Sequence, residues 1–509
     1  MTVTTRIIKN TGFLYGKMII TVFISLYTTK LILNSLGPSD FGIFNIVGGI
    51  IGMLGFLNST MANASLRFMS FAEGEGCLDA KRKIFNVSFI LHLAIAIVTV
   101  VLLLGVMYPL FNDILNIVPN RVHSAKIVYI CLVVSTVLTI VNVPYDAVMN
   151  AHENMFYYSI IGILESLLRL LVAFACMFTS HDKLIVYGIL MALIPLLTLS
   201  IMKIYCHKHY QECHFSLRQY WDVKLVKQIA SFSGWNFLTA TSSLFSAQGI
   251  GIVLNHFYGT VLNASQGIAN QLSGQMSSFS KNMMKAVNPV IVKSAGAKNL
   301  RGMNVVTIAS CKYSTYLTLI FAIPFMIEMP YILKIWLKDV PDWASLFCIL
   351  QIIQTVICQM ADSASTAVYA QGDIKGYAIY KSVMNAMPVL LAYLSLRLGG
   401  APYWIYIPMI VIWAIGGNVV IIAYAKSKCG LVVKDYFKGV FFPVIGVSLV
   451  MFFVGIIPFT LMSEGLMRLI VTCCITTIGM GMAIFLFGME TIEKQYVVKV
   501  IDDIVRRWK

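Results

Sequence analysis

The segment Phe13–Val47, FLYGKMIITVFISLYTTKLILNSLGPSDFGIFNIV, holds two apolar runs separated by a turn-forming Gly-Pro-Ser-Asp sequence. A helix of about 20 residues crosses roughly 30 Å of hydrocarbon, so the first run, 13–36, is long enough to span a membrane. The second run, 41–68, is long enough as well. The segment therefore predicts two successive membrane-spanning helices joined by a tight turn.

Similar apolar runs recur along nearly all of the 509 residues. Hydrophobic residues make up 58% of the chain, charged residues only 12%, and the mean hydropathy is +0.81. A soluble protein has about 25% charged residues, because a packed interior needs a charged exterior. The surplus apolar surface must face lipid. We expect an all-α integral membrane protein with about 14 transmembrane helices, near 13–36, 41–68, 84–108, 125–149, 158–180, 184–206, 229–256, 260–290, 304–330, 344–370, 377–398, 403–425, 440–462 and 466–488.

The formal net charge is +16, and the connectors share it unevenly. One alternating set of connectors carries about 23 basic residues, including the KRK run at 81–83 and the RRWK tail at 506–509, whereas the other set carries about 7. An excess of Lys and Arg is typical of cytoplasmic loops. We therefore expect both termini to be cytoplasmic, and we attribute the charge to topology rather than to nucleic-acid binding.

Two segments resemble each other at equivalent places in the helix order. LILNSLG ends the first span at Gly37, and IVLNHFYG ends the seventh span at Gly259; Asn34 and Asn255 within them lie 221 positions apart. Six spans per half give both halves the same orientation, as in transporters built from parallel repeats. Basic and aromatic residues between the halves favour an interfacial helix. We expect an N-terminal six-helix bundle at 1–206, a cytoplasmic interfacial linker at 207–228, a C-terminal six-helix bundle at 229–425, and two further spans with a cytoplasmic tail at 426–509.

Three stretches carry a family resemblance: FLYGK in the first span, LGPSDFGIFNIV at the turn into the second, and ASLRFMSFAEGEG at the end of the second. They resemble the polysaccharide flippases of the MOP (multidrug/oligosaccharidyl-lipid/polysaccharide) exporter superfamily. The resemblance implies two six-helix bundles arranged as a V around a central cavity, similar to MATE transporters. Fourteen spans is similar to the lipid II flippase branch, whereas many O-antigen flippases are assigned twelve.

The same resemblance implies a function and a location. It implies alternating access that moves an undecaprenyl-pyrophosphate-linked oligosaccharide to the outer leaflet of the bacterial cytoplasmic (inner) membrane. The oligosaccharide would be an O-antigen unit of lipopolysaccharide or another surface polysaccharide unit. Association with the polysaccharide polymerase machinery is implied as well.

Basic residues within the predicted spans are the first candidates for a binding site. A cation at mid-membrane costs about 2.5–3.5 kcal/mol, so it should face a cavity or a partner. Lys281 and Lys285 share one helix face in SSFSKNMMKAVNP, and no acidic residue stands within a turn of either. Cations near the end of a span can instead extend to the interface. The candidate cations for an anionic headgroup are Lys17, Arg67, Lys281, Lys285 and Lys381.

Polar and acidic residues within the spans complete the predicted site. The seventh and eighth spans are rich in Asn, Gln, Ser and Thr, which favours a water-filled cavity for sugar hydroxyls; the alternative is hydrogen bonding between packed helices. Asp362 and Glu165 are candidates for coupling to H⁺ or Na⁺. Glu165 stands four residues before Arg169, however, so the two can neutralise each other. The polar candidates are Asn236, Asn255, Gln271 and Gln275.

The chain lacks the motifs of several other functions. It has no Walker A sequence, HExxH motif or Ser/His/Asp order, and its cysteines show no CxxC pairing. We therefore expect no catalytic residues, no metal, no cofactor and no enzyme activity. Because basic residues outnumber acidic ones within the spans, we expect an anionic substrate, in agreement with the flippase for a lipid-linked oligosaccharide, in contact with membrane lipid, that the resemblance implies. The alternative is a cation-coupled multidrug (MATE-type) efflux transporter.

Overall fold

The computed structural model describes residues 3–115, 117–337, 339–489 and 494, and every regular element in these residues is a helix. Among them, 12 helices are long and apolar enough to cross a membrane, in agreement with the expected all-α membrane protein. The basic tail at 506–509 lies outside the described residues. The 12 spans are Thr5–Gly37, Leu78–Asn112, Pro119–Ala151, Met155–Phe178, Lys183–His209, Val223–Gly259, Leu300–Ile327, Ala344–Ala370, Lys375–Arg397, Pro402–Cys429, Val433–Leu461 and Leu466–Gly488.

The other two predicted spans are also helical, but they differ from the rest. The span expected at 41–68 is a bent pair, Ser39–Gly52 and Leu57–Glu75, whose axes meet at 52°; with this pair the count is 13. The span expected at 260–290 forms the second part of α8 (Val223–Gly296). Its many Ser, Asn and Gln side chains keep it less apolar than the 12 spans. The expected number of about 14 transmembrane helices is therefore close to the number in the structure.

The chain divides into two compact units. Unit 1 comprises Met1–Ala240 and Lys285–Asn299, and unit 2 comprises Thr241–Met284 and Leu300–Lys509. Helix α8 contributes to both. The predicted bundles at 1–206 and 229–425 stay a prediction, because the division into compact units does not show which residues form each half of the repeat.

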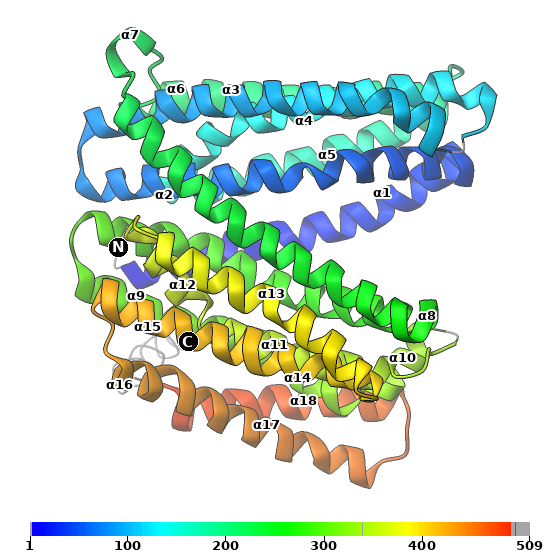
Figure 1. Cartoon of the computed structure of the whole chain (residues 1–509), viewed down its shortest axis with the longest axis vertical. Coiled ribbons are helices and arrows are strands. Elements are labelled where there is room, and N and C mark those ends of the chain that lie inside the picture. The colour runs from blue at the N-terminus through cyan, green and yellow to red at the C-terminus, as the bar shows by residue number, and fades with distance from the viewer. Residues whose placement is uncertain (1–2, 116, 338, 490–493, 495–509) are drawn as a thin grey trace, which may run out of the picture. The chain divides into compact units, whose positions relative to one another are not determined.

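Unit 1 is built around α4, which packs against α2, α3 and α6, while α1 packs against α5 (Figure 1). Phe85, Tyr145 and Met149 lie in its apolar core. Its helices are α1 (Val3–Met53), α2 (Gly55–Glu75), α3 (Leu78–Pro109), α4 (Val122–Ala151), α5 (Met155–Phe178), α6 (Lys183–His209) and α7 (Leu217–Tyr220), with the ends of α8.

Unit 2 is built around α9, which packs against α11, α12, α17 and α18. Its helices are the middle of α8, α9 (Leu300–Ile327), α10 (Met329–Trp336), α11 (Ala344–Gln359), α12 (Asp362–Ala370), α13 (Lys375–Arg397), α14 (Tyr406–Pro408), α15 (Gly417–Cys429), α16 (Val433–Tyr436), α17 (Phe442–Leu461) and α18 (Leu466–Ala483). Wider helical turns at Met409–Gly416, Phe437–Phe441 and Ile484–Gly488 extend α15, α17 and α18.

Gly37 in α1 and Gly259 in α8 each join two spans by a single non-helical residue. Their φ angles are 77° and 75°, in the left-handed region that glycine adopts readily and other residues rarely do. Their ψ angles, 167° and −165°, are also similar. The two glycines lie 222 positions apart. The predicted repeat therefore has a structural counterpart at these two turns.

The linker at 207–228 does not form one interfacial helix. Its two ends belong to α6 and α8, and between them only the four-residue α7 is helical. The rest docks on α3, where the Asn86 side chain donates to the carbonyl of His214 and accepts from the N–H of Ser216, both at 2.9 Å. These bonds satisfy backbone groups that a continuous helix would have paired internally.

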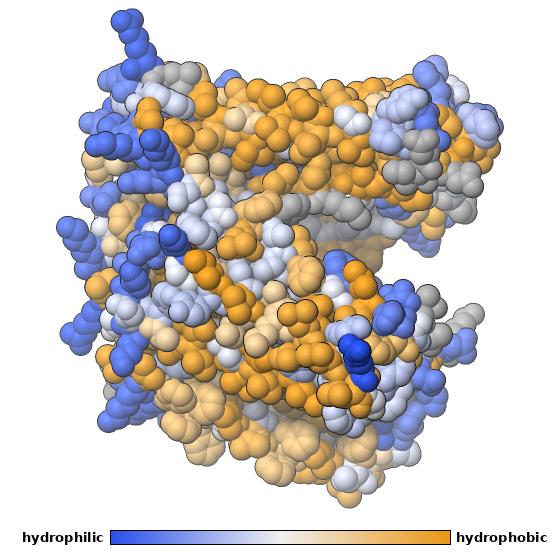
Figure 2. All heavy atoms as spheres, in the orientation of Figure 1, coloured by the Kyte–Doolittle hydropathy of each residue, from blue (hydrophilic) through white to orange (hydrophobic). Residues whose placement is uncertain are grey.

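Apolar side chains cover the flanks of the spans in each unit, and hydrophilic ones gather near the helix ends (Figure 2). Phe23 and Val101 of unit 1 are 70% and 64% exposed, and Leu390 and Phe453 of unit 2 are 66% and 64% exposed. Leaving such a side chain in water rather than burying it costs roughly 1.5–3 kcal/mol. The exposed apolar flanks are therefore those of a multi-span membrane protein, whose spans contact lipid.

Candidate functional site

Two lysines, a tyrosine and an aspartate meet in unit 1. Lys17 of α1 and Lys285 of α8 lie over the ring of Tyr158 of α5, with Nζ 4.5 Å and 3.7 Å from the ring centroid. Asp146 of α4 interacts electrostatically with both lysines. We call Lys17, Asp146 and Lys285 triad 1. It combines cation–π contacts with an opposite charge, which is how cations inside a membrane protein are accommodated.

An apolar cluster positions triad 1. Leu14, Met155 and Ala286 pack together, and each is at most 1% exposed. Each stands one to three positions from a lysine of the triad or from the tyrosine between the lysines, so fixing these three residues also fixes the polar side chains. Gly162 of α5 provides the space, since a Cβ there would collide with the side chain of Lys17.

A second group of the same composition lies in unit 2. Asp362, the first residue of α12, interacts electrostatically with Lys381 of α13 and Lys281 of α8. A break between α11 and α12 leaves Asp362 exposed at a helix start within one span. Lys381 approaches α15 closely, because a Cβ on Gly417 would lie 2.8 Å from its Nζ. We call Lys281, Asp362 and Lys381 triad 2.

The triads identify partners for two predicted cations and reveal a residue that sequence reasoning missed. Lys281 and Lys285 have no carboxylate near them in sequence, so each was expected to face a cavity or a partner. In the structure Asp362 interacts electrostatically with Lys281, and Asp146 with Lys285, each within its own unit. Asp146 was not among the predicted site residues. The sequence did contain an indication of its role. Asp146 stands in the later part of the fourth predicted span, as Asp362 does in the fourth span of the second predicted half.

The fifth predicted cation, Arg67 of α2, belongs to neither triad. It is 9% exposed, and its guanidinium carbon lies 4.5, 4.8 and 5.6 Å from the ring centroids of Phe68, Phe71 and Phe232. Arginine stacks well on aromatic faces, which accounts for its burial.

The predicted pairing of Glu165 with Arg169 is confirmed. The two side chains form an ion pair of 2.7 Å on α5, and they are 40% and 47% exposed. Glu165 also interacts electrostatically with Asp146. Its predicted role in ion coupling stays a prediction.

The polar residues of α8 differ in their surroundings, and the predicted water-filled cavity stays a prediction. Gln266 bonds neighbouring groups: its side chain accepts from Tyr406 at 2.7 Å and donates to Asn270 at 3.2 Å. The predicted cavity residues are instead open to the surface or half-buried. They are Asn236, half-buried in unit 1, and Asn255, Gln271 and Gln275, exposed in unit 2.

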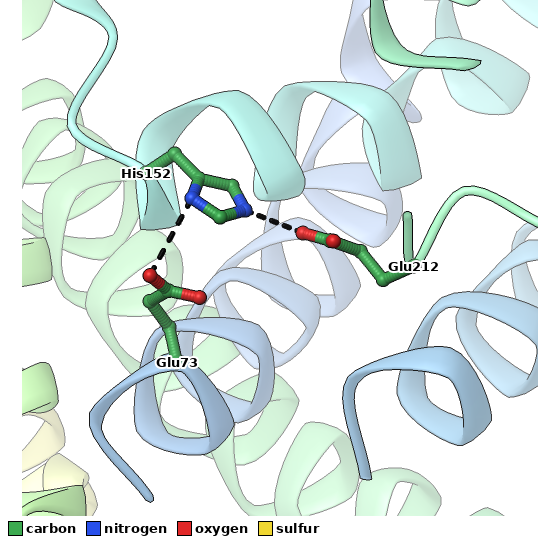
Figure 3. Close-up of side chains that lie close together, drawn as sticks. All are labelled: Glu73, His152 and Glu212. Carbon is green, nitrogen blue, oxygen red and sulfur yellow. Dashed lines mark hydrogen bonds and ion pairs between the residues drawn. The ribbon is translucent and has the colours of Figure 1, made fainter. Parts of the chain in front are cut away.

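A separate cluster of ionisable groups lies near the ends of α2 and α4. His152, in the turn between α4 and α5, stands between Glu73 of α2 and Glu212 of the linker (Figure 3). Its Nδ1 is 3.4 Å from the Glu73 carboxylate, and its Nε2 contacts the Glu212 carboxylate. Burial alone would raise the pKa of the Glu212 carboxyl, but the hydrogen bond with His152, a backbone hydrogen bond and the nearby charge of Lys81 together outweigh burial and lower the pKa below its ordinary value.

By residue type, Glu73, His152 and Glu212 could hold a metal ion, since their ligand atoms lie within 4.8 Å of one another. The geometry favours another arrangement. The carboxylates face different ring nitrogens, whereas one ion binds an imidazole through a single nitrogen. The cluster thus fits a His152 ring held between two carboxylates better than a metal centre.

Comparison with known proteins identifies the fold. No family model matches the chain, and no curated protein matches it. A MATE transporter in the bent conformation superposes with a TM-score of 0.70 at 13% identity, covering 85% of this chain and 97% of the other. The outward-facing structure of a multidrug resistance MATE family transporter of the MOP superfamily gives 0.67 at 12% identity, covering 83% and 96%.

A third match is a MOP superfamily transporter from Pyrococcus furiosus, whose binding pocket is described as reversed in polarity, suggesting a different function. Its TM-score is 0.65 at 14% identity, and it covers 84% of this chain and 96% of the other. At such identities the similarity concerns the fold. The chain has the fold of the MATE transporters of the MOP superfamily, whose members among these matches are transporters and not enzymes.

Proposed function

We propose that the chain is a flippase that moves an anionic, lipid-linked oligosaccharide across the membrane by alternating access. The observation that carries this proposal is the composition of the two triads, each of which has two lysines and one aspartate. With all groups ionised, each triad keeps one uncompensated positive charge. A bound anion would remove this imbalance.

A pyrophosphate linker matches such a site. Lysine acts as a point charge toward phosphate, and within a membrane an unpaired cation favours any anionic partner. The exposed Gln271 and Gln275 offer hydrogen-bonding groups of the kind that sugar hydroxyls need. An undecaprenyl-pyrophosphate-linked unit of O-antigen or another surface polysaccharide combines these features.

The membrane potential would assist this transport. Two negative charges that leave a negative cytoplasm gain roughly 4–5 kcal/mol per 100 mV, since each charge contributes about 2.3 kcal/mol. Asp362 and Glu165 are our candidates for coupling to H⁺ or Na⁺. We further propose that the protein lies in the bacterial inner membrane, has both termini in the cytoplasm and associates with a polysaccharide polymerase.

The second candidate is a cation-coupled multidrug efflux transporter. It is favoured by the fold, because the matching structures include a multidrug resistance MATE transporter. A transporter of cationic drugs needs acidic groups to dominate its site, and in the triads lysine exceeds aspartate. For this reason the anionic cargo is our first proposal.

Transport by the reconstituted full-length protein distinguishes the two. We expect proteoliposomes to move a fluorescent polyprenyl-diphosphate-linked oligosaccharide between leaflets, and not ethidium, a cationic dye. The double variant Lys281→Ala/Lys285→Ala removes one cation from each triad. It should slow glycan transfer at least about 10-fold, which corresponds to about 1.4 kcal/mol.

Lys30→Ala is the matched control, because Lys30 is an exposed cation on α1 outside both triads. It should leave the transfer rate unchanged. If the double variant transfers the glycan as fast as the control, the triads do not bind the cargo. Transport of ethidium without glycan transfer would favour the multidrug function instead.

A further inference from the structure

The C-terminal end of α8 crosses the end of α2 in unit 1, and two glycines allow the close approach. A Cβ at Gly74 would overlap the carbonyl of Lys293, and a Cβ at Gly296 would overlap the carbonyl of Phe71. Gly74 and Gly296 lie 222 positions apart, as do Phe71 and Lys293. The two contacts are therefore equivalent under the repeat, as in an interface with two-fold symmetry. Small residues at a crossing let helix backbones approach closely.

An ion-pair network fastens this crossing. The Nζ of Lys293 lies 3.5 Å from the carboxylate of Glu73 at the end of α2, and also 3.5 Å from that of Glu153 in the α4–α5 turn. Lys293 is thus shared between two carboxylates rather than held tightly by one. The residue equivalent to Lys293 under the repeat is Phe71, which has no charge. The ionic contact therefore occurs on one side of the crossing only.

Both carboxylates keep another cationic partner. Lys81 of α3 lies 2.8 Å from Glu73, and Arg6 of α1 lies 2.6 Å from Glu153. Breaking a buried ion pair is costly when it leaves one charge unpaired. Here Lys293 can leave without stranding a carboxylate, and its long side chain can reach water once free. The arrangement has the properties of a contact that opens and recloses.

We propose that Lys293, Glu73 and Glu153 form a latch that holds the end of α8 on α2 and on the α4–α5 turn, and that each transport cycle opens it. Alternating access requires the helix ends on one side of the membrane to separate and to meet again. The glycine crossing brings the ends together, and the latch holds them. This inference rests on transport by alternating access and holds for either cargo.

Hydrogen–deuterium exchange of the full-length protein in lipid nanodiscs tests the latch. Lys293→Gln removes both ion pairs of Lys293, so backbone amides in 70–77 and 290–299 should exchange at least about 5-fold faster, because local opening becomes more frequent. Lys293→Arg keeps the charge and should restore slow exchange. Gly74→Ala disturbs the crossing without changing a charge, and it should also speed exchange in these two segments.

Lys298→Gln is the matched control. Lys298 lies five residues after Lys293 and is exposed, and the described part of the chain shows no ion pair for it. The backbone amides of the Lys298→Gln variant should exchange at the wild-type rate. The proposal is overturned if Lys293→Gln behaves like this control, or if exchange rises equally in α17 and α18, which would mean general loss of structure.

Discussion

Asp182 shows how one side chain can fix the start of a helix and hold it to a neighbour. It caps α6 by accepting from the N–H of Leu184 and of Ile185 at 3.0 and 3.4 Å. It also accepts from Ser124 at 2.8 Å and pairs with Arg121 at 2.7 Å. Burial alone would raise the pKa of its carboxyl, but the hydrogen bond from Ser124 and the other contacts outweigh burial and lower the pKa. The fold therefore favours the ionised form.

The lowered pKa of Asp182 predicts a loss of stability in acid. Its contribution is fully present above the unfolded pKa of about 3.9, and it is lost as the pH falls through the lower folded value. We expect the thermal midpoint of the wild type to fall more steeply below about pH 5 than that of Asp182→Asn. At pH 7 Asp182→Ala should lose about 1 kcal/mol more than Asp182→Asn, because asparagine still caps a helix. Thermal unfolding in detergent would measure both effects; equal stability of the two variants would exclude the capping role.

At the scale of elements, a buried ion pair holds the terminal helices α17 and α18 to the rest of unit 2. The two helices lie side by side, orange and red in Figure 1, and both pack against α9. Arg468 donates to the carboxylate of Glu328 at 2.8 and 3.2 Å, and Thr472 donates to it at 3.1 Å. The Glu328 side chain is 0% exposed. Between the same parts of the chain, Lys334 and Glu464 form an exposed ion pair of 3.1 Å.

These two ion pairs should differ in their effect on stability. Arg468→Met leaves the Glu328 carboxylate buried and without its cation, which should cost about 3–5 kcal/mol. Glu464→Gln breaks the exposed pair and should cost less than about 1 kcal/mol. Thermal unfolding of the purified variants would compare them. A similar midpoint for both would mean that the buried pair does not hold the terminal helices.

At the scale of the whole molecule, the alternation of basic connectors predicts which helix ends share a side of the membrane. Lys426 lies exposed at the end of α15, in a connector rich in lysine. A maleimide that cannot cross the membrane should label Lys426→Cys only in inverted vesicles. Arg397→Cys, at the end of α13 on the sparse side, should be labelled in intact cells. The exposed Cys77 and Cys474 need replacement beforehand, and labelling of Lys426→Cys in intact cells would reverse the topology.

Local sequence patterns are enough to predict the helical, membrane-spanning class, the approximate bounds of most spans and the two glycine turns. These features depend on local hydropathy and on the steric freedom of single residues, and both are visible in a short window of sequence. The bend between Ser39–Gly52 and Leu57–Glu75 was missed, because the helix pattern continues on either side of it.

The partners of the charged side chains, in contrast, depend on how the helices pack. Lys285 interacts electrostatically with Asp146, and Lys293 forms ion pairs with Glu73 and Glu153, although each pair is more than 130 positions apart in the chain. Arg67, predicted beside the lysines, is instead buried among aromatic rings. Such encounters depend on how whole helices pack, and a charged side chain inside a membrane protein takes whichever partner the packing brings within reach. The sequence therefore predicted which residues are unusual, and the packing of the helices determined their partners.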